Sequence, residues 1–277
     1  MIKSLTSLRG IFILFIFFHH CLDLYPGGGS MAVTFFFILG GFSMTLGYKD
    51  KVSKPDFNYR QYITRRCIRF YPLHWLCLLA ALPVALISFN WKLIPLLFIN
   101  ATLTQTLIPL KEAYFSFNAV SWYLSDTLIF ALIFPFIIRL ILRATLKGKI
   151  VFCTILAAIY ASIAIVIPSD WYHYVLYICP FVRITDFVFG IFLALGYEEL
   201  KERHYSFLNK GVLCQIIVLF LIVFLVLESC LLQGNARVFA PVYWFPIAVM
   251  LLIASLSNTN GGGTIYWKTN GCNVLVN

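Results

Sequence analysis

Apolar runs long enough to enter a bilayer recur along the chain and constrain its fold more than any other feature. A membrane-spanning helix needs about 20 mostly apolar residues, and such runs occupy residues 8–24, 31–48, 70–89, 118–138, 150–167, 174–197, 211–232 and 238–256. Of the 277 residues, 61% are hydrophobic and only 12% are charged. A soluble domain is about half apolar and a quarter charged. We therefore predict an all-α, polytopic transmembrane bundle of about eight spans, forming one domain over residues 1–277.

The basic residues predict how the bundle is oriented. The formal charge is +10, from 21 Lys and Arg against 11 Asp and Glu. Lys and Arg concentrate in residues 49–69, after residue 138 and in the linker 198–210. Cytoplasmic loops carry an excess of Lys and Arg, so these segments and the N-terminus, with Lys3 and Arg9, are predicted to be cytoplasmic. This bias explains the charge without a nucleic-acid partner.

Residues 91–110 are apolar but do not fit a span. They include Pro95, Asn100, Gln105 and Pro109. The preceding span is predicted to end outside and the following one to begin outside, so this segment must return to its own side. Non-helical backbone at membrane depth is tolerated only where it is buried in protein or lines a cavity. We predict one re-entrant hairpin here.

The cysteines and the N-terminus do not indicate a disulfide framework, a metal site or a cleaved signal peptide. The eight cysteines are scattered without a Cys-x-x-Cys pair, which favours small buried hydrophobic side chains over a disulfide framework or a metal site. No metal is predicted. The first apolar run is followed by Tyr25-Pro26-Gly27 rather than a small-residue cleavage site, which indicates a retained first span.

The first run carries ionisable side chains, Arg9, His19 and His20. Ionisable groups are costly in a membrane and mark functional sites there. On a helix, His20 returns to within about 20° of Arg9, about 16 Å further along, whereas His19 lies about 80° off that line. We predict His20 near mid-bilayer as the catalytic residue, because a neutral imidazole can deprotonate a hydroxyl. His19 is interpreted as a second ring beside it.

Arg66 and Arg69 lie at the predicted cytoplasmic end of the third run. Side chains spaced i and i+3 share a helix face, and guanidinium groups bind phosphate oxygens in a bidentate manner. Together with Arg9, they are predicted to bind a phosphate-bearing ligand that arrives from the cytoplasm. The alternative is ordinary cytoplasmic charge, which we accept for Arg60 and Arg65.

Three further groups lie inside apolar runs. Trp122, Tyr123, Ser125 and Asp126 are predicted to line the acceptor side of a cavity, although an interfacial aromatic belt and helix caps explain them equally well. Arg183 and Asp186, at i and i+3, are predicted to form a structural ion pair. Gly40-Gly41 is predicted to let two helices approach closely.

Five segments together resemble the acyltransferase 3 family of integral-membrane O-acyltransferases. In family order over residues 5–195, they are Leu8-Arg9-Gly10 through His20, Phe35-Phe36 with Gly40-Gly41-Phe42, Arg65-Arg66 with Arg69 and Tyr71-Pro72, Ser121 to Ser125, and Arg183 with Asp186-Phe187 and Gly190. The resemblance implies transfer of an acyl group, commonly acetyl from acetyl-CoA, to a hydroxyl of an extracytoplasmic glycan. It also implies an essential His20, with Arg9, Arg66 and Arg69 on the donor side.

The chain departs from the family pattern at a few positions. Gly40 replaces the usual Ser, and Asp126 stands near where a Glu is common. Family members continue into further helices, about ten spans in all, so the chain is expected to be truncated after Asn277. The resemblance implies a plasma-membrane location, in a bacterium the inner membrane, with the bilayer, acyl-CoA and a glycan as partners.

Two other functions stay open at this point. Intramembrane His, Arg and Asp also mark the ion paths of solute or proton-coupled transporters. Transporters often contain repeated halves with matching broken helices, and the sequence has one predicted hairpin without a counterpart. The second alternative is an inactive truncated product.

Overall fold

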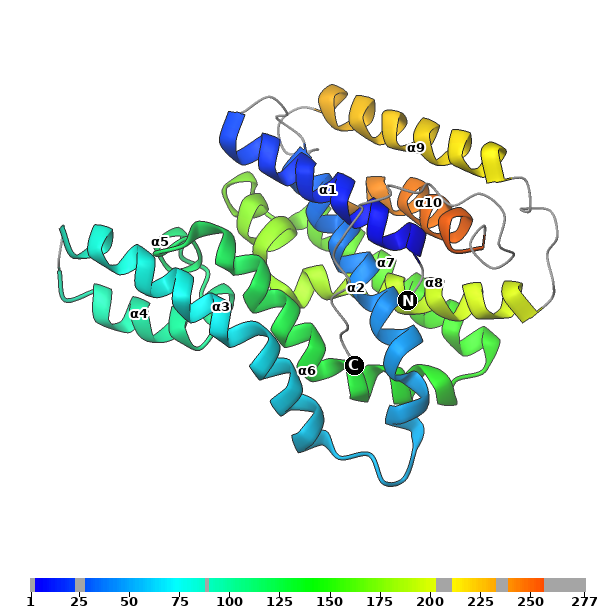
Figure 1. The fold of residues 1–277 in the computed structure, drawn as a ribbon, viewed down its shortest axis with the longest axis horizontal. Coiled ribbons are helices and arrows are strands. Elements are labelled where there is room, and N and C mark those ends of the chain that lie inside the picture. Colours follow the sequence, from blue (N-terminus) through cyan, green and yellow to red (C-terminus); the bar gives the residue numbers. More distant parts are fainter. Residues whose placement is uncertain (1–2, 23–27, 88–89, 203–210, 233–238, 257–277) are drawn as a thin grey trace, which may run out of the picture.

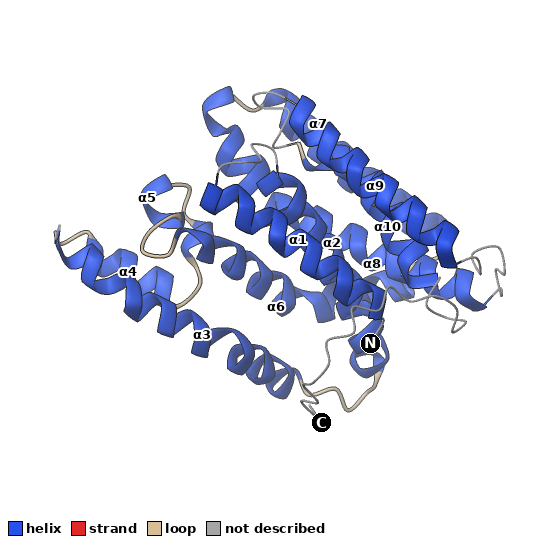
Figure 2. Ribbon diagram, turned by 45° about the horizontal axis from the view of Figure 1, so that its top comes forward, coloured by secondary structure: helices blue, strands red, loops and turns tan. Residues whose placement is uncertain are grey.

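The computed structural model describes residues 3–22, 28–87, 90–202, 211–232 and 239–256. This part of the chain is helical and contains no strand (Figure 2). Seven helices are long and apolar enough to span a membrane: α1 (Lys3–Leu22), α2 (Gly28–Ser53), α3 (Tyr59–Ile87), α6 (Trp122–Arg143), α7 (Leu146–Val166), α8 (Pro180–Glu202) and α9 (Gly211–Leu231). A shorter apolar helix, α10 (Trp244–Leu256), follows the 3₁₀ turn η7 (Ala240–Tyr243). The predicted all-α polytopic bundle is confirmed (Figure 1).

The helices α2 and α3 extend further into the basic segment than predicted. The second span was expected to end at Tyr48 and the third to begin at 70, but α2 continues to Ser53 and α3 begins at Tyr59. Most of the basic residues 49–69 therefore lie on helix ends rather than in a loop. Residues 203–210 of the predicted linker and the tail from 257 lie outside the described residues.

Polar contacts hold several of these helix ends together. Lys49 near the end of α2 pairs with Glu198 near the end of α8. On α6, Arg139 Nε donates a hydrogen bond of 3.0 Å to the Val52 carbonyl oxygen of α2. We call this side of the bundle, where α2, α6 and α8 end and α3 and α7 begin, the basic end. The other side, where α6 begins, is called the hairpin end.

The segment between α3 and α6 enters and returns without crossing the bundle. Its longest helix, α4 (Leu93–Ala101), has nine residues and is about 13 Å long, too short to span a bilayer. It lies beside α3 (Figure 1), where His74 Nε2 is 2.8 Å from the Asn100 carbonyl oxygen. The short helices η1 (Gln105–Leu107), α5 (Lys111–Tyr114) and η2 (Ala119–Ser121) then lead to α6. This path has the form of the predicted hairpin.

The predicted continuous span over 174–197 was wrong at its start. The chain there forms a π-helix, η4 (His173–Ile178), followed by extended backbone at Cys179 and a new helix from Pro180. Proline lacks the backbone N–H that a helix interior requires, so it begins α8 instead of continuing η4. Arg183 therefore lies in the first turn of α8. Single π-helical turns are frequent at functional sites.

The helices α2 and α8 cross at the centre of the bundle with their backbones in contact. A Cβ on Gly41 would lie 1.9 Å from the Phe187 carbonyl oxygen, and one on Gly190 would lie 2.0 Å from the Ile38 carbonyl oxygen. No side chain fits at either position. The predicted close approach is confirmed at Gly41, whereas a Cβ on Gly40 would make only an ordinary 3.7 Å contact with the Phe187 ring.

Gly41→Ala and Gly190→Ala are each expected to destabilise the bundle. The added methyl group must push the two backbones apart, and overpacking of this kind costs about 1–3 kcal/mol. The measurement is the thermal unfolding of purified protein in detergent. Gly47→Ala and Gly196→Ala are matched controls on the same two helices, because a Cβ at either position meets nothing within 4 Å. Equal melting temperatures for all four variants would contradict the crossing.

Candidate functional site

Arg9 on α1 interacts with side chains of three other helices, α2, α3 and α6. From α1, its Nη2 donates a hydrogen bond of 2.8 Å to Ser43 Oγ on α2. Its charge also interacts with Arg69 on α3 and with the Tyr123 side chain on α6. Arg9 is half-buried and Arg69 is exposed. Two nearby positive charges repel each other, and a bound anion would relieve that repulsion.

Arg66 has a different environment from Arg69, although the two were predicted to act as a pair from one helix face. Its side chain is buried, and its guanidinium lies over the ring of Tyr48 at 4.4 Å and over that of Tyr62 at 5.2 Å. Arg66 Nε and Nη2 have no hydrogen-bond partner among the described residues. Buried donors are almost always paired, so these two N–H groups are suited to donate hydrogen bonds to an anionic oxygen.

His19 and His20 lie in the last turn of α1, with ring centroids 5.1 Å apart. The described part of α1 ends at Leu22, two residues beyond His20, and the expected mid-bilayer position of His20 stays a prediction. His20 is exposed and His19 is partly buried. The His19 ring lies against Gly29, with atoms 2.9 Å from the position of a Cβ there, and the Tyr177 hydroxyl is 3.5 Å from the same point. The sequence did not indicate that His19 is the ring in contact with α2.

The polar residues at the start of α6 mainly hold the hairpin in place. Ser125 Oγ donates to the Leu103 carbonyl oxygen at 2.7 Å and lies 2.8 Å from the Thr106 hydroxyl. Trp122 is buried, with its ring 4.9 Å from that of Tyr177. Of the four residues predicted to line an acceptor side, Trp122, Ser125 and Asp126 are buried and Tyr123 is partly exposed.

Asp126 is fully buried beside these contacts. Its carboxylate lies near the Thr106 hydroxyl and within electrostatic range of Arg183. Neither carboxylate oxygen forms a well-aligned hydrogen bond with the part of the chain that the structure describes.

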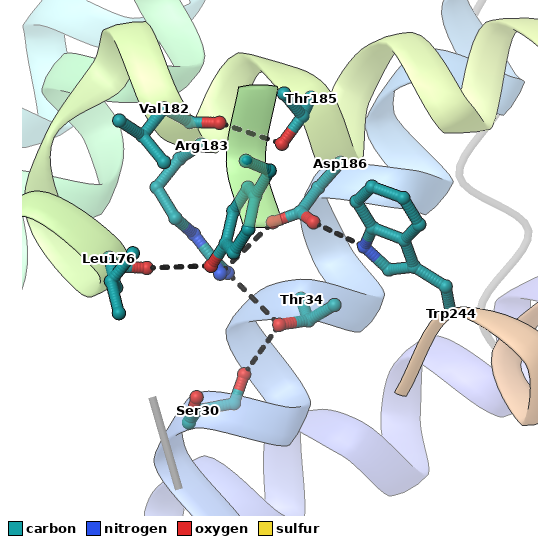
Figure 3. A network of polar contacts seen from close by, with 9 residues as sticks. Ser30, Thr34, Leu176, Val182, Arg183, Thr185, Asp186 and Trp244 are labelled. Atoms are coloured by element: carbon teal, nitrogen blue, oxygen red, sulfur yellow. Dashed lines mark hydrogen bonds and ion pairs between the residues drawn. The ribbon is translucent and has the colours of Figure 1, made fainter. Parts of the chain in front are cut away.

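Arg183 and Asp186 form an ion pair inside the bundle, with 3.1 Å between Arg183 Nη1 and Asp186 Oδ2 and both side chains completely buried. Figure 3 shows the network around them. Arg183 Nη2 donates to Thr34 Oγ1 at 3.0 Å, and Trp244 Nε1 donates to Asp186 Oδ1 at 2.6 Å. The Arg183 guanidinium also lies 5.1 Å from the ring centroid of Phe37. The network joins α2, α8 and α10, and its purely structural role stays a prediction.

Sequence reasoning missed three residues that complete these contacts, namely Ser43, Thr34 and Trp244. Their partners are 34, 149 and 58 residues away in the chain, so no local spacing could reveal them. Among the described residues, no group of three or more His, Cys, Asp or Glu is placed to hold a metal ion.

A comparison with known proteins identifies the family. The family model described as an acyltransferase domain matches residues 2–265, nearly the whole chain. Neither the curated proteins nor the solved structures compared with the chain gave a match. The matched region contains all five segments noted in the sequence and all the helices described above. The chain therefore belongs to the acyltransferase 3 family of multi-pass membrane acyltransferases.

Proposed function

We propose that this protein is a membrane O-acyltransferase that moves an acyl group from cytoplasmic acyl-CoA to a hydroxyl of a cell-surface or exported carbohydrate. We propose acetyl as the acyl group. The enzyme would then be an acyltransferase that transfers groups other than aminoacyl groups. The observation that carries the proposal is the buried Arg66, whose Nε and Nη2 have no hydrogen-bond partner among the described residues, together with two further arginines, Arg9 and Arg69, whose charges repel each other.

The predicted topology places the acyl donor and the carbohydrate acceptor on opposite sides of the membrane. Basic side chains favour the cytoplasmic side of a membrane, so the basic end is assigned to the cytoplasm, together with the N-terminus. The location is the plasma membrane, in a bacterium the inner membrane. The hairpin end and the His19–His20 turn then face the extracytoplasmic side.

The arginines suit the phosphate groups of acyl-CoA. Guanidinium groups form strong charge-assisted hydrogen bonds with phosphate oxygens. Bound phosphates would relieve the repulsion between Arg9 and Arg69 and supply partners for Arg66 Nε and Nη2. About 16 Å of helix separates Arg9 from His20, and the extended pantetheine arm of CoA would carry the thioester along this direction.

His20 is assigned the proton transfer. The neutral ring takes the proton of the acceptor hydroxyl while the hydroxyl oxygen attacks the thioester carbonyl. The carbon–sulfur bond then breaks, the new ester forms, and the CoA thiolate takes the proton back from the imidazolium. In a variant of this route, the imidazole nitrogen first accepts the acyl group, releases CoA and passes the acyl group to the hydroxyl.

His20→Ala is expected to lower acyl transfer by about 100-fold or more, since general-base catalysis contributes about 10²–10⁴-fold. Transfer of labelled acetyl from acetyl-CoA is measured in membranes that contain equal amounts of folded protein. His19→Ala is the matched control, because the two rings are neighbours with different surroundings. A wild-type rate in His20→Ala would remove the assignment to His20, and a total loss in His19→Ala alone would move it to His19. If the membranes take up a solute and no acetyl group is transferred, the proposed acyltransferase function is contradicted.

Arg66→Ala and Arg69→Ala are each expected to raise the KM for acyl-CoA by about 10-fold, since a hydrogen bond to a charged group contributes about 1.5–3 kcal/mol. Arg65→Ala is the control, because Arg65 is an exposed neighbour of Arg66 on the same helix and should leave the KM unchanged. The readout is initial transfer rate against acyl-CoA concentration. If all three variants respond alike, the arginines act only as general surface charge and the donor site is misplaced.

A further inference from the structure

A second site lies at the hairpin end, away from the three arginines. The hairpin and the segment just before α8 line a half-open pocket of about 410 Å³, within the range of about 300–1,000 Å³ typical of small-ligand sites. Its lining joins one turn of α5 to the start of η4 and includes Lys111, Tyr114, Phe115, Asp170, Trp171, His173 and Tyr174. The proposed mechanism uses none of these residues.

Aromatic rings form one wall of this pocket. The ring of Tyr114 lies nearly parallel to that of Tyr174, at 5.7 Å and 28°, and to that of His173, at 6.2 Å and 27°. Trp171 stands 6.4 Å from Tyr174 and keeps 47% of its surface exposed. An exposed tryptophan beside stacked rings offers flat apolar faces that are not used for internal packing.

Polar groups stand beside the aromatic wall. The lining includes the ammonium group of Lys111, which can donate hydrogen bonds to a ligand, and the carboxylate of Asp170, which can accept them from a ligand. One Asp170 oxygen accepts a hydrogen bond of 3.3 Å from the Ser169 hydroxyl. Burial, and then the charge of Lys111, lower the pKa of His173 below its ordinary value. A neutral imidazole has one donor and one acceptor nitrogen. The pocket therefore combines apolar faces with donors and acceptors of both kinds and nearly balanced charge.

This combination matches one class of ligand. A pyranose ring has an apolar C–H face that stacks on aromatic side chains and a rim of hydroxyl groups that both donate and accept hydrogen bonds. A lipid chain would leave the charged groups without partners. A nucleotide phosphate would need a cluster of cations, whereas Lys111 and Asp170 bring opposite charges.

The pocket is also connected to the histidine pair through packed rings. The His173 ring lies 5.4 Å from that of Tyr177. The Tyr177 hydroxyl and the His19 ring in turn approach the same point at Gly29. A ligand in the pocket thus lies at one end of a row of side chains that leads to the proposed catalytic turn.

We propose that this pocket binds a pyranose ring of the carbohydrate acceptor, with Trp171 and Tyr174 as the stacking surface and Asp170 and Lys111 as hydroxyl ligands. The proposal rests on the proposed function, because that function supplies a carbohydrate acceptor. It assigns a binding site and a class of ligand to residues that have no role in the proposed mechanism.

Direct binding tests the pocket without any acyl transfer. The full chain is placed in lipid nanodiscs free of sugar-headgroup detergent, and saturation-transfer NMR is recorded with a panel of methyl pyranosides. At least one glycoside is expected to bind the wild type. Trp171→Ala should weaken that binding by about 10-fold, because it removes the exposed stacking face, and Asp170→Asn should weaken it as well. Trp91→Ala is the control, because Trp91 is 78% exposed outside the pocket lining.

The outcomes separate the pocket from the enzyme. If no pyranoside binds, or if Trp171→Ala and Trp91→Ala bind alike, the pocket assignment is overturned even where acyl transfer is active. If glycosides bind through Trp171 but no acyl group moves, the pocket stands and the proposed function fails. With both intact, Trp171→Ala should raise the KM for the acceptor and leave the KM for acyl-CoA unchanged.

Discussion

The backbone contact between α2 and α8 determines where the other parts of the bundle lie. The absence of a Cβ at Gly41 and Gly190 lets carbonyl oxygens occupy the space of side chains, as small residues do at membrane helix interfaces. The same approach brings Thr34 of α2 within hydrogen-bond distance of Arg183 on α8. An ion pair in a low-dielectric interior is tolerated only with such partners. On the other side of α2, the stacked rings of Phe12 and Phe35 place α1 with Arg9 and the two histidines.

The helical architecture could be predicted from the sequence because apolar length is a local property. The end of α2 and the start of α3 could not, since the basic turns that continue α2 to Ser53 and begin α3 at Tyr59 are helical without being apolar. The break at η4 was not predicted, because an apolar run has the same composition whether it folds as a π-helix, an α-helix or an interrupted helix. Within the site, the spacing of Arg9 and His20 indicated residues of interest but not their surroundings. The approach of Arg9 to Arg69 and the burial of Arg66 depend on how distant helices pack.

The two ends of the bundle present different chemistry. Arg66 and Arg69 belong to the half of α3 nearer the basic end, and an aromatic pocket with nearly balanced charge lies at the hairpin end. The helix α1 joins the two regions, since it carries Arg9 near its start and His19 and His20 in its last turn. Such an arrangement suits a reaction in which an anionic donor and a hydroxylated acceptor come from opposite sides of a membrane. The hairpin is fixed to the bundle at one of these ends, because its Asn100 and Leu103 carbonyl oxygens accept hydrogen bonds from His74 of α3 and Ser125 of α6.

The π-helical turn at His173–Ile178 has a consequence for how related chains can diverge. A π turn contains one residue more than an α turn, and the extended backbone at Cys179 separates it from α8. The loss of a single residue there would therefore shift the preceding side chains by about 100° around the axis of η4 without turning α8. His173 and Tyr174 would then leave the pocket, while Arg183 and Asp186, held by α2 and α10, would stay in place. The lining of the pocket can thus change by insertion or deletion without disturbing the buried ion pair. This turn separates the pocket lining from the ion pair.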